Sequence, residues 1–159
     1  MSGDKLKRYI SYLLFFVSFA FGYYAIDQGY VALSKNVSES IPHKYFIATK
    51  AKLSATQGRY VSFNHPSNER FKLLKQVKGI AGDVISVRDG EVFVNNENCG
   101  ALMSYGERLG IALHPIQEGK IPEGYIYAHA PHPESFDSRY EEFGLIKTKD
   151  IDYILWRLF

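Results

Sequence analysis

The sequence is poor in cysteine. Cys99 is the only one in 159 residues, so the chain cannot form an internal disulfide or hold a zinc ion with several cysteines. A lone thiol with no motif around it is most often a small buried residue, and we expect this of Cys99.

Runs of one charge and clusters of metal ligands are missing as well. Lysine and arginine number 19 against 17 acidic residues, and they are scattered, so nucleic acid is not an expected partner. No cysteine or paired carboxylate accompanies His114, His129 and His132. We therefore interpret them as isolated surface histidines and expect neither a metal nor a cofactor.

One long apolar segment stands near the N-terminus. Residues 9–26 contain no charge, and Lys5, Lys7 and Arg8 precede them. As a helix this segment is roughly 27 Å long, close to the bilayer core of roughly 30 Å. Tyrosines occur at both ends, as in the aromatic belts of membrane helices, at positions 9, 12, 23 and 24.

The flanking charges predict an orientation. The basic cluster marks the cytoplasmic side, so residues 1–8 are predicted to be cytoplasmic and 9–26 a single-pass transmembrane anchor. Residues 27–159 then form one domain in the periplasm or on the outer face of the membrane. A cleaved signal peptide and a buried core helix are the alternatives. A signal peptide would have a shorter apolar core, and no clean cleavage site follows the apolar segment before Asp27, which favours the uncleaved anchor.

Beyond the anchor the pattern is that of strands. Short stretches rich in β-formers alternate with turn residues, and Asp89-Gly90 is typical of a tight hairpin turn. The predicted strands are 45–49, 59–63, 71–78, 84–87, 91–94, 125–128 and 151–158. No long amphipathic helix follows the anchor. We expect a mainly β domain, a coiled or barrel-like set of sheets, in which residues 95–123 form unassigned connections.

The segment at 36–42 offers a candidate nucleophile. Ser38 and Ser40 stand two residues apart, just before Pro42. We interpret Ser40 as a nucleophile, which requires a base elsewhere in the chain and donors for an oxyanion. Taken alone, such a segment is far more often a turn.

The segment at 71–79 offers a candidate base. In a strand Lys75 shares a face with Phe71, Leu73 and Val77, so it is the lysine on the apolar side. Desolvation favours the neutral amine and lowers its pKa, which a serine without histidine requires. The alternative is a strand with two wet faces, on which Lys75 extends its amine to solvent.

A third segment, 135–140, contains a carboxylate two residues before an arginine. Asp137 and Arg139 can face each other across a turn and brace a loop. By itself this pattern is typical of an ordinary surface hairpin.

Taken in order, the three segments resemble the type I signal peptidases, family S26. The shared pattern is Ser-x-Ser-hydrophobic-Pro at 38–42, a lysine four residues before Gly79 and then Gly82-Asp83, and Ser-x-Asp-Ser-Arg at 135–139. Proline two positions after the serine is similar to the short conjugative-transfer branch, the TraF-type peptidases. The resemblance implies a signal-peptidase-like β fold.

The resemblance also implies roles. Ser40 would be the nucleophile and Lys75 its general base, and the Ser38 hydroxyl with the Ser40 amide would form the oxyanion hole. The implied supporting residues are Ser135, which would orient Lys75, and the pair Asp137 and Arg139. The implied activity is that of a serine endopeptidase in the bacterial inner membrane. Its implied partners are membrane lipid and an exported precursor, such as a pilin or another conjugative transfer protein.

Two departures lie beside the third segment. The stretch 129–132, His-Ala-Pro-His, replaces the usual Gly-Asp-Asn, and Glu141 and Glu142 are inserted before Phe143. They leave the geometry of this loop, and hence substrate preference, open. The sequence also does not decide between water and an amine as the acceptor. A general signal peptidase and a non-catalytic, membrane-tethered β scaffold are the other functional readings. The intact Ser40 and Lys75 argue against the scaffold.

Overall fold

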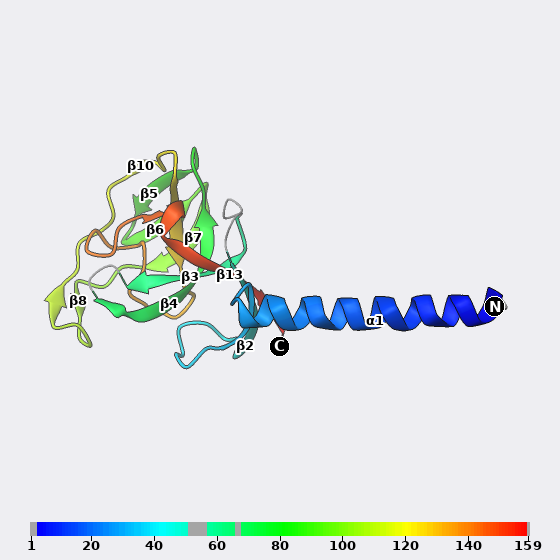
Figure 1. The fold of residues 1–159 in the computed structure, drawn as a ribbon. Coiled ribbons are helices and arrows are strands. Elements are labelled where there is room, and N and C mark those ends of the chain that lie inside the picture. The colour runs from blue at the N-terminus through cyan, green and yellow to red at the C-terminus, as the bar shows by residue number, and fades with distance from the viewer. Residues whose placement is uncertain (1–2, 51–56, 66–67, 159) are drawn as a thin grey trace.

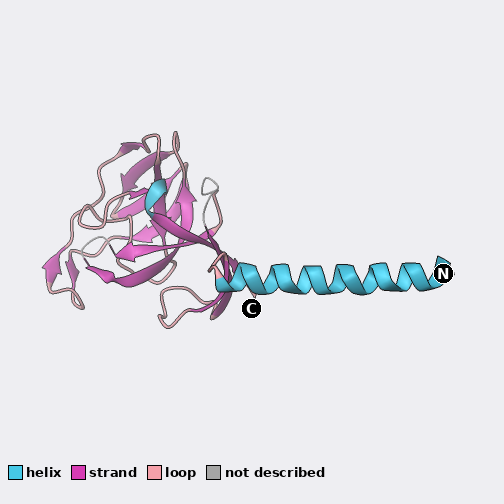
Figure 2. Cartoon of the chain, viewed as in Figure 1, coloured by secondary structure: helices cyan, strands magenta, loops and turns pink. Residues whose placement is uncertain are grey.

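A long helix projects from a β domain in the computed structural model, which describes residues 3–50, 57–65 and 68–158 (Figures 1 and 2). The helix, α1 (Gly3–Asp27), begins before the predicted apolar segment because Lys5, Leu6 and Lys7 have high helix propensity. Within the described residues it is long and apolar enough to cross a membrane, and none of it is buried. Met1 and Ser2 of the predicted cytoplasmic segment lie outside the described residues.

The β domain contains two main sheets and a small hairpin. The larger sheet has the order β1-β2-β13-β3-β4-β11-β12, the smaller one β10-β5-β6-β7, and β8 pairs with β9. The strands are β1 (Val31–Lys35), β2 (Tyr45–Lys50), β3 (Tyr60–His65), β4 (Asn68–Gly79), β5 (Val84–Arg88), β6 (Glu91–Val94), β7 (Glu97–Ala101), β8 (Tyr105–Gly106), β9 (Ile111–Ala112), β10 (Gly119–Lys120), β11 (Tyr125–His129), β12 (Ile146–Lys147) and β13 (Ile151–Arg157). A single 3-10 turn, Thr148–Asp150, precedes β13.

The predicted mainly β class is confirmed, and each predicted strand is present with ends shifted by a few residues. The hairpin turn between β5 and β6 is also confirmed. Asp89 and Gly90 both have positive φ, 51° and 78°, and Arg88 lies opposite Glu91, as a two-residue turn requires. The stretch predicted as connections contains β7 and three two-residue strands.

The core beneath the candidate site has two parts. Val61, Val77 and Ala128 pack in one cluster between β3, β4 and β11. Ile41 and Phe46 pack in another beneath the loop between β1 and β2. Burial of Ile41 therefore fixes the backbone directly after Ser40.

Cys99 lies in the core cluster under the smaller sheet, as predicted. Burial raises the pKa of its thiol to about 11, so the thiol stays protonated at neutral pH. A buried, protonated thiol is a poor nucleophile, which fits a packing role.

Gly79, at the end of β4, is packed too tightly for a side chain. A Cβ placed there would lie 2.6 Å from Ile121 Cδ1 and 2.9 Å from Val94 Cγ1. We expect Gly79→Ala to lower the free energy of unfolding by about 1–3 kcal/mol through overpacking. Thermal unfolding followed by circular dichroism of the full chain in detergent measures it. Gly106→Ala is the control, because its Cβ would meet nothing closer than 3.4 Å. Equal stability of the two variants would contradict this packing.

Candidate active site

The loop that carries Ser40 is held by Asn36. The Asn36 amide donates to the carbonyls of Ile41 at 3.0 Å and His43 at 3.1 Å. Its Oδ1 accepts from the Ser38 amide at 3.0 Å and the Ser38 hydroxyl at 2.9 Å. Ser40 is partly exposed, and its hydroxyl makes no hydrogen bond within the described residues. The loop is thus ordered by its neighbours, while the candidate nucleophile is left accessible.

Lys75 lies on the buried face of β4. Only 4% of it is exposed, and its Nζ donates to Ser135 Oγ at 2.6 Å. Val77 shares this face, as alternation predicts, and is fully buried. Phe71 does not follow, because 63% of it is exposed. The apolar face of β4 is therefore shorter than predicted, because the residues before Leu73 lie outside the core.

The surroundings of Lys75 favour a neutral amine. Burial lowers the pKa of Lys75 to about 8, while nearby Asp137 raises it and nearby Arg139 lowers it. The Nζ also lies 5.8 Å from the centre of the Phe143 ring. The predicted direction of the shift is confirmed. An amine with this pKa can accept a proton near neutral pH.

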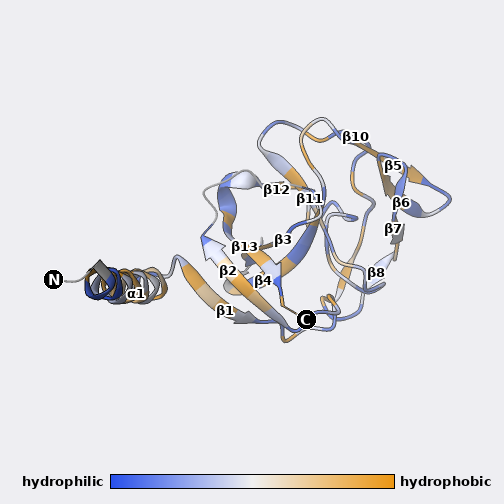
Figure 3. Cartoon of the chain, turned by 90° about the vertical axis from the view of Figure 1, so that its right-hand side faces the viewer, coloured by the Kyte–Doolittle hydropathy of each residue, from blue (hydrophilic) through white to orange (hydrophobic). Residues whose placement is uncertain are grey.

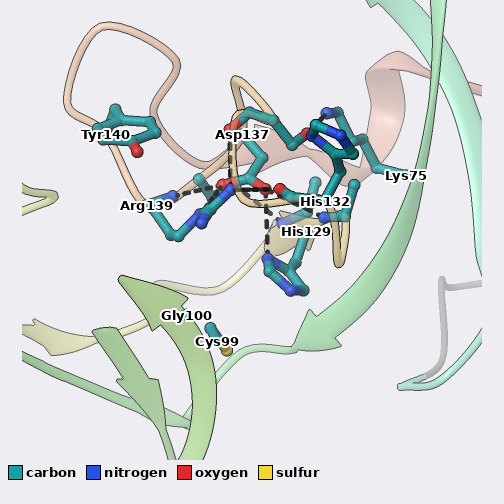
Figure 4. A network of polar contacts seen from close by, with 12 residues as sticks. Lys75, Cys99, Gly100, His129, His132, Asp137, Arg139 and Tyr140 are labelled. Carbon is teal, nitrogen blue, oxygen red and sulfur yellow. Dashed lines mark hydrogen bonds and ion pairs between the residues drawn. The ribbon is translucent and has the colours of Figure 1, made fainter. Parts of the chain in front are cut away.

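Asp137 and Arg139 form the ion pair that the sequence predicts, and the pair is buried and does not lie on a surface hairpin. Arg139 Nε donates to Asp137 Oδ1 at 2.9 Å and its Nη2 to Oδ2 at 3.2 Å (Figure 4). Nη1 donates to the Ala101 carbonyl at 3.1 Å, and Nη2 also reaches the carbonyls of His132 and Ser135 at 3.2 and 2.9 Å. One guanidinium therefore ties the end of β7 to the loop that carries Ser135.

His129 belongs to the same network, so its reading as a surface histidine is wrong. It is buried at the end of β11, with Nδ1 3.2 Å from Asp137 Oδ2 (Figure 4). This contact is not aligned as a hydrogen bond. Burial alone would raise the pKa of Asp137, but His129 and Arg139 more than offset it, so the pKa lies below its usual range. His114 is exposed, as expected, and pairs with Glu142 at 2.6 Å.

No group of three or more His, Cys, Asp or Glu side chains able to hold a metal ion occurs in the part of the chain that the structure describes.

Two hollows meet at Ser40 and Lys75. The larger, about 890 Å³, runs from them beneath the β8–β9 hairpin and along the Ser135 loop. The smaller, about 390 Å³, lies between β1 and β4 and includes Ser38. The structure thus places Ser40 and Lys75 at the junction of both hollows, with Ser135 in the larger and Ser38 in the smaller. Asp137 and Arg139 lie behind them, away from the hollows.

The sequence analysis missed the part that Asn36 and His129 play in this site. An asparagine two residues before a serine is a known signal for a turn closed by the side chain, and it could have identified Asn36. No local sequence pattern identifies His129 as part of the site, because its contact with Asp137 depends on where β11 ends in the fold.

Comparison with known proteins shows what the chain is similar to. The family model described as signal peptidase, peptidase S26, matches residues 6–153. The conjugal transfer protein TraF of Agrobacterium fabrum, strain C58, is 30% identical over 74 residues. That match covers 46% of this chain and 41% of the relative, so it spans less than half of that protein's length. A signal peptidase I of Enterococcus faecalis V583, known from a crystal structure, aligns with a TM-score of 0.44 and 19% identity over 67% of this chain and 100% of that one.

The lowered pKa of Lys75 makes stability depend on pH. Between about 8 and 10.5 the unfolded chain holds a proton on Lys75 that the folded chain has released, so stability rises with pH in this window. The rise is roughly 3 kcal/mol, because each pKa unit is worth about 1.4 kcal/mol. We expect this rise in the difference between the free energies of unfolding of wild type and Lys75→Met, measured by urea unfolding at several pH values. The exposed Lys120, replaced by Met, is the control. Parallel curves for wild type and Lys75→Met would refute it.

The buried ion pair predicts an asymmetric mutational cost. Asp137→Ala leaves the Arg139 guanidinium buried without its partner, so we expect a loss of about 3–5 kcal/mol. The double variant Asp137→Ala/Arg139→Leu should recover part of the loss, because no charge is left behind. Glu97→Gln breaks the exposed pair with Lys78 and should cost under about 1 kcal/mol. Thermal unfolding of the full chain measures all three. An equal cost for Asp137→Ala and Glu97→Gln would rule this out.

Proposed function

The chain belongs to the signal peptidase family, peptidase S26, and from this premise we propose that it is a membrane-anchored serine endopeptidase with a Ser40–Lys75 dyad. In this proposal it removes leader peptides from exported precursor proteins that take part in conjugative transfer. The similarity to a conjugal transfer protein supports this setting.

The observation that carries the proposal is the meeting of the two hollows at Ser40 and Lys75. A peptide bond at their junction would have the accessible hydroxyl on one side and the buried amine close by. Burial keeps the pKa of that amine near 8, so a useful fraction is neutral at physiological pH. A scaffold would gain nothing from a lysine in such an environment.

The proposed reaction proceeds through an acyl-enzyme. Neutral Lys75 Nζ takes the proton of Ser40 Oγ as this oxygen bonds to the substrate carbonyl carbon. The Ser40 amide and the Ser38 hydroxyl stabilise the oxyanion. The C–N bond then breaks, and the departing amine takes the proton from Lys75. Water, deprotonated by Lys75, attacks the ester carbonyl carbon. The bond from this carbon to Ser40 Oγ then breaks, and Ser40 Oγ takes the proton back from Lys75. The Ser38 hydroxyl must turn away from Asn36 Oδ1 to reach the oxyanion.

The smaller hollow suits an extended peptide. β1 is an edge strand of the larger sheet, so one of its two sides pairs with no other described strand. In β4, Leu73 and Lys75 pair with β3, whereas the pairing with β11 begins only at Gln76. Both edges border the smaller hollow. We propose that the leader peptide lies between them as an added strand, with main-chain hydrogen bonds to either side.

The proposed topology follows from α1. Residues 1–8 are cytoplasmic, residues 9–26 span the bacterial inner membrane once, and residues 27–159 form the peptidase domain in the periplasm. Membrane lipid and an exported precursor, such as a pilin or another transfer protein, are the proposed partners, and nucleic acid is not one. The reaction as proposed uses no metal or cofactor.

The test is cleavage of a tagged exported precursor by membranes that contain equal amounts of each variant. We expect Ser40→Ala and Lys75→Met to lower the rate by at least about 10³-fold, as loss of a nucleophile or its base does. Lys78→Met, on the same strand and outside both hollows, should keep it. The wild-type rate should rise as the pH passes through about 8, because Lys75 must be neutral to act.

Cleavage that survives Lys75→Met would show that another group is the base. Processing of ordinary secretory precursors as fast as that of transfer proteins would favour a general signal peptidase. A wild type that cuts no precursor, including one encoded for conjugation, would favour the scaffold.

A further inference from the structure

The larger of the two hollows at Ser40 and Lys75 extends toward the end of the domain opposite to α1. It is lined by β8, which lies at the end of the domain away from the helix (Figure 1). The view along α1 agrees, with β1 beside the helix and β8 across the domain from it (Figure 3). The smaller hollow is lined by β1. A peptide that occupies both hollows therefore runs from the helix side of the domain to its far end.

The β8–β9 hairpin gives the larger hollow an apolar wall. Tyr105 and Leu109 line the hollow, and their exposed fractions are 53% and 43%. Ile111, on the other strand of the hairpin, is 38% exposed but does not line the hollow. The hairpin thus turns one side toward the hollow, and the apolar groups on that side are available to a ligand.

The opposite wall includes the Phe136 ring, which follows Ser135 in the chain. This ring stacks on His65 with 6.0 Å between the ring centres and meets Phe143 edge to face at 5.2 Å. Because two neighbouring rings hold it, Phe136 loses little conformational freedom when a side chain packs on it. The hollow is therefore apolar on both sides.

A charged pair lies at the exposed rim of the hollow. The Arg108 guanidinium, in the turn of the hairpin, is 4.0 Å from the Glu134 carboxylate in the loop that carries Ser135, and the two side chains are 81% and 62% exposed. The hairpin thus reaches this loop across the hollow. An ion pair as exposed as this one contributes little, so the apolar walls decide which side chain the hollow prefers.

We propose that the larger hollow binds the start of the mature segment, which is the part of the substrate that follows the cut. Tyr105, Leu109 and Phe136 select a large apolar side chain in this segment. The inference rests on the proposed function, in which the leader peptide occupies the smaller hollow and the membrane lies on the side of α1. The chain beyond the cut leaves Ser40 through the larger hollow, because an exported segment extends away from that membrane.

This selection gives the peptidase a second means of choosing its substrate. Two precursors with the same leader are cleaved at different rates when only one has a large apolar side chain at the start of its mature segment. Packing of that side chain between the two walls removes apolar surface from water and stabilises the bound precursor and its transition state.

The test varies the substrate after the cut alone. A tagged exported precursor keeps its leader, and its mature segment begins with a stretch of alanine and serine through which one phenylalanine is moved. We expect wild-type membranes to cleave the precursor with the best-placed phenylalanine roughly ten-fold faster, as kcat/KM, than the precursor without phenylalanine. Tyr105→Ser/Leu109→Ser should cleave both at the slower rate.

Ile111→Ser is the matched control, because Ile111 belongs to the same hairpin, is similarly exposed and does not line the hollow. This variant should keep the full preference for phenylalanine. Circular dichroism in detergent confirms that each variant is folded.

A binding measurement separates this inference from the dyad. Fluorescein-labelled peptides with the sequence of the freed mature segment, with and without the phenylalanine, are titrated into full-length Ser40→Ala in detergent and followed by anisotropy. We expect the phenylalanine peptide to bind roughly ten-fold more tightly. The difference should vanish when Tyr105→Ser/Leu109→Ser is added to Ser40→Ala.

Equal cleavage of the precursors with and without phenylalanine by wild type would overturn the selection. So would a preference that survives Tyr105→Ser/Leu109→Ser, or hairpin variants that change the response to the leader and not to the mature segment. A wild type that cuts no precursor would overturn the proposed function, while the peptide titration would still decide whether the hollow binds an apolar segment.

Discussion

The buried ion pair between Asp137 and Arg139 is the constraint on which the candidate site depends. Removing two charges from water is costly, and the cost is met only when the remaining donors and acceptors find partners. Here the guanidinium also donates to three carbonyls, one of which belongs to Ser135. The hydroxyl of Ser135 in turn accepts from Lys75. The position of the amine is thus set by a network whose partial loss would leave an unpaired charge in the core.

The same pair accounts for the state of Lys75. A lone carboxylate at this place would stabilise the ammonium and keep the pKa high. Asp137 raises the pKa of Lys75 and Arg139 lowers it, so the two oppose each other and burial decides the outcome. The pair therefore gives rigidity to the loop without restoring the charge of the amine. The fold is less stable at neutral pH because a protonated Lys75 must be buried away from water. In return, the site retains an amine that can accept a proton near neutral pH.

Regular features could be predicted from the sequence, and contacts across the fold could not. Alternation over several residues was enough for the β4 strand and the side on which Lys75 lies. The two-residue strands β8 and β9 contain too few residues for any pattern. The reach of His129 to Asp137 depends on how β11 pairs with β4, where the register shifts at a bulge. The position of Ser40 and Lys75 on the same two hollows likewise depends on the sheet closing so that β1 approaches β4, although three strands separate β1 from β4 in the strand order.

The connection between α1 and β1 limits where the proposed chemistry can occur. Only residues 28–30 separate the helix from the strand. Tyr30 is hydrogen-bonded to both neighbouring elements: its amide donates to the Ala25 carbonyl of α1 at 2.8 Å, and its carbonyl accepts from the Lys50 amide of β2 at 3.1 Å. The helix therefore continues almost directly into the strand that leads to Ser40. With α1 across the membrane, the nucleophile can only act close to the bilayer surface. A leader peptide that is itself still in the membrane presents its cleavage site at that level, so a short connection suits such a substrate better than a freely diffusing one.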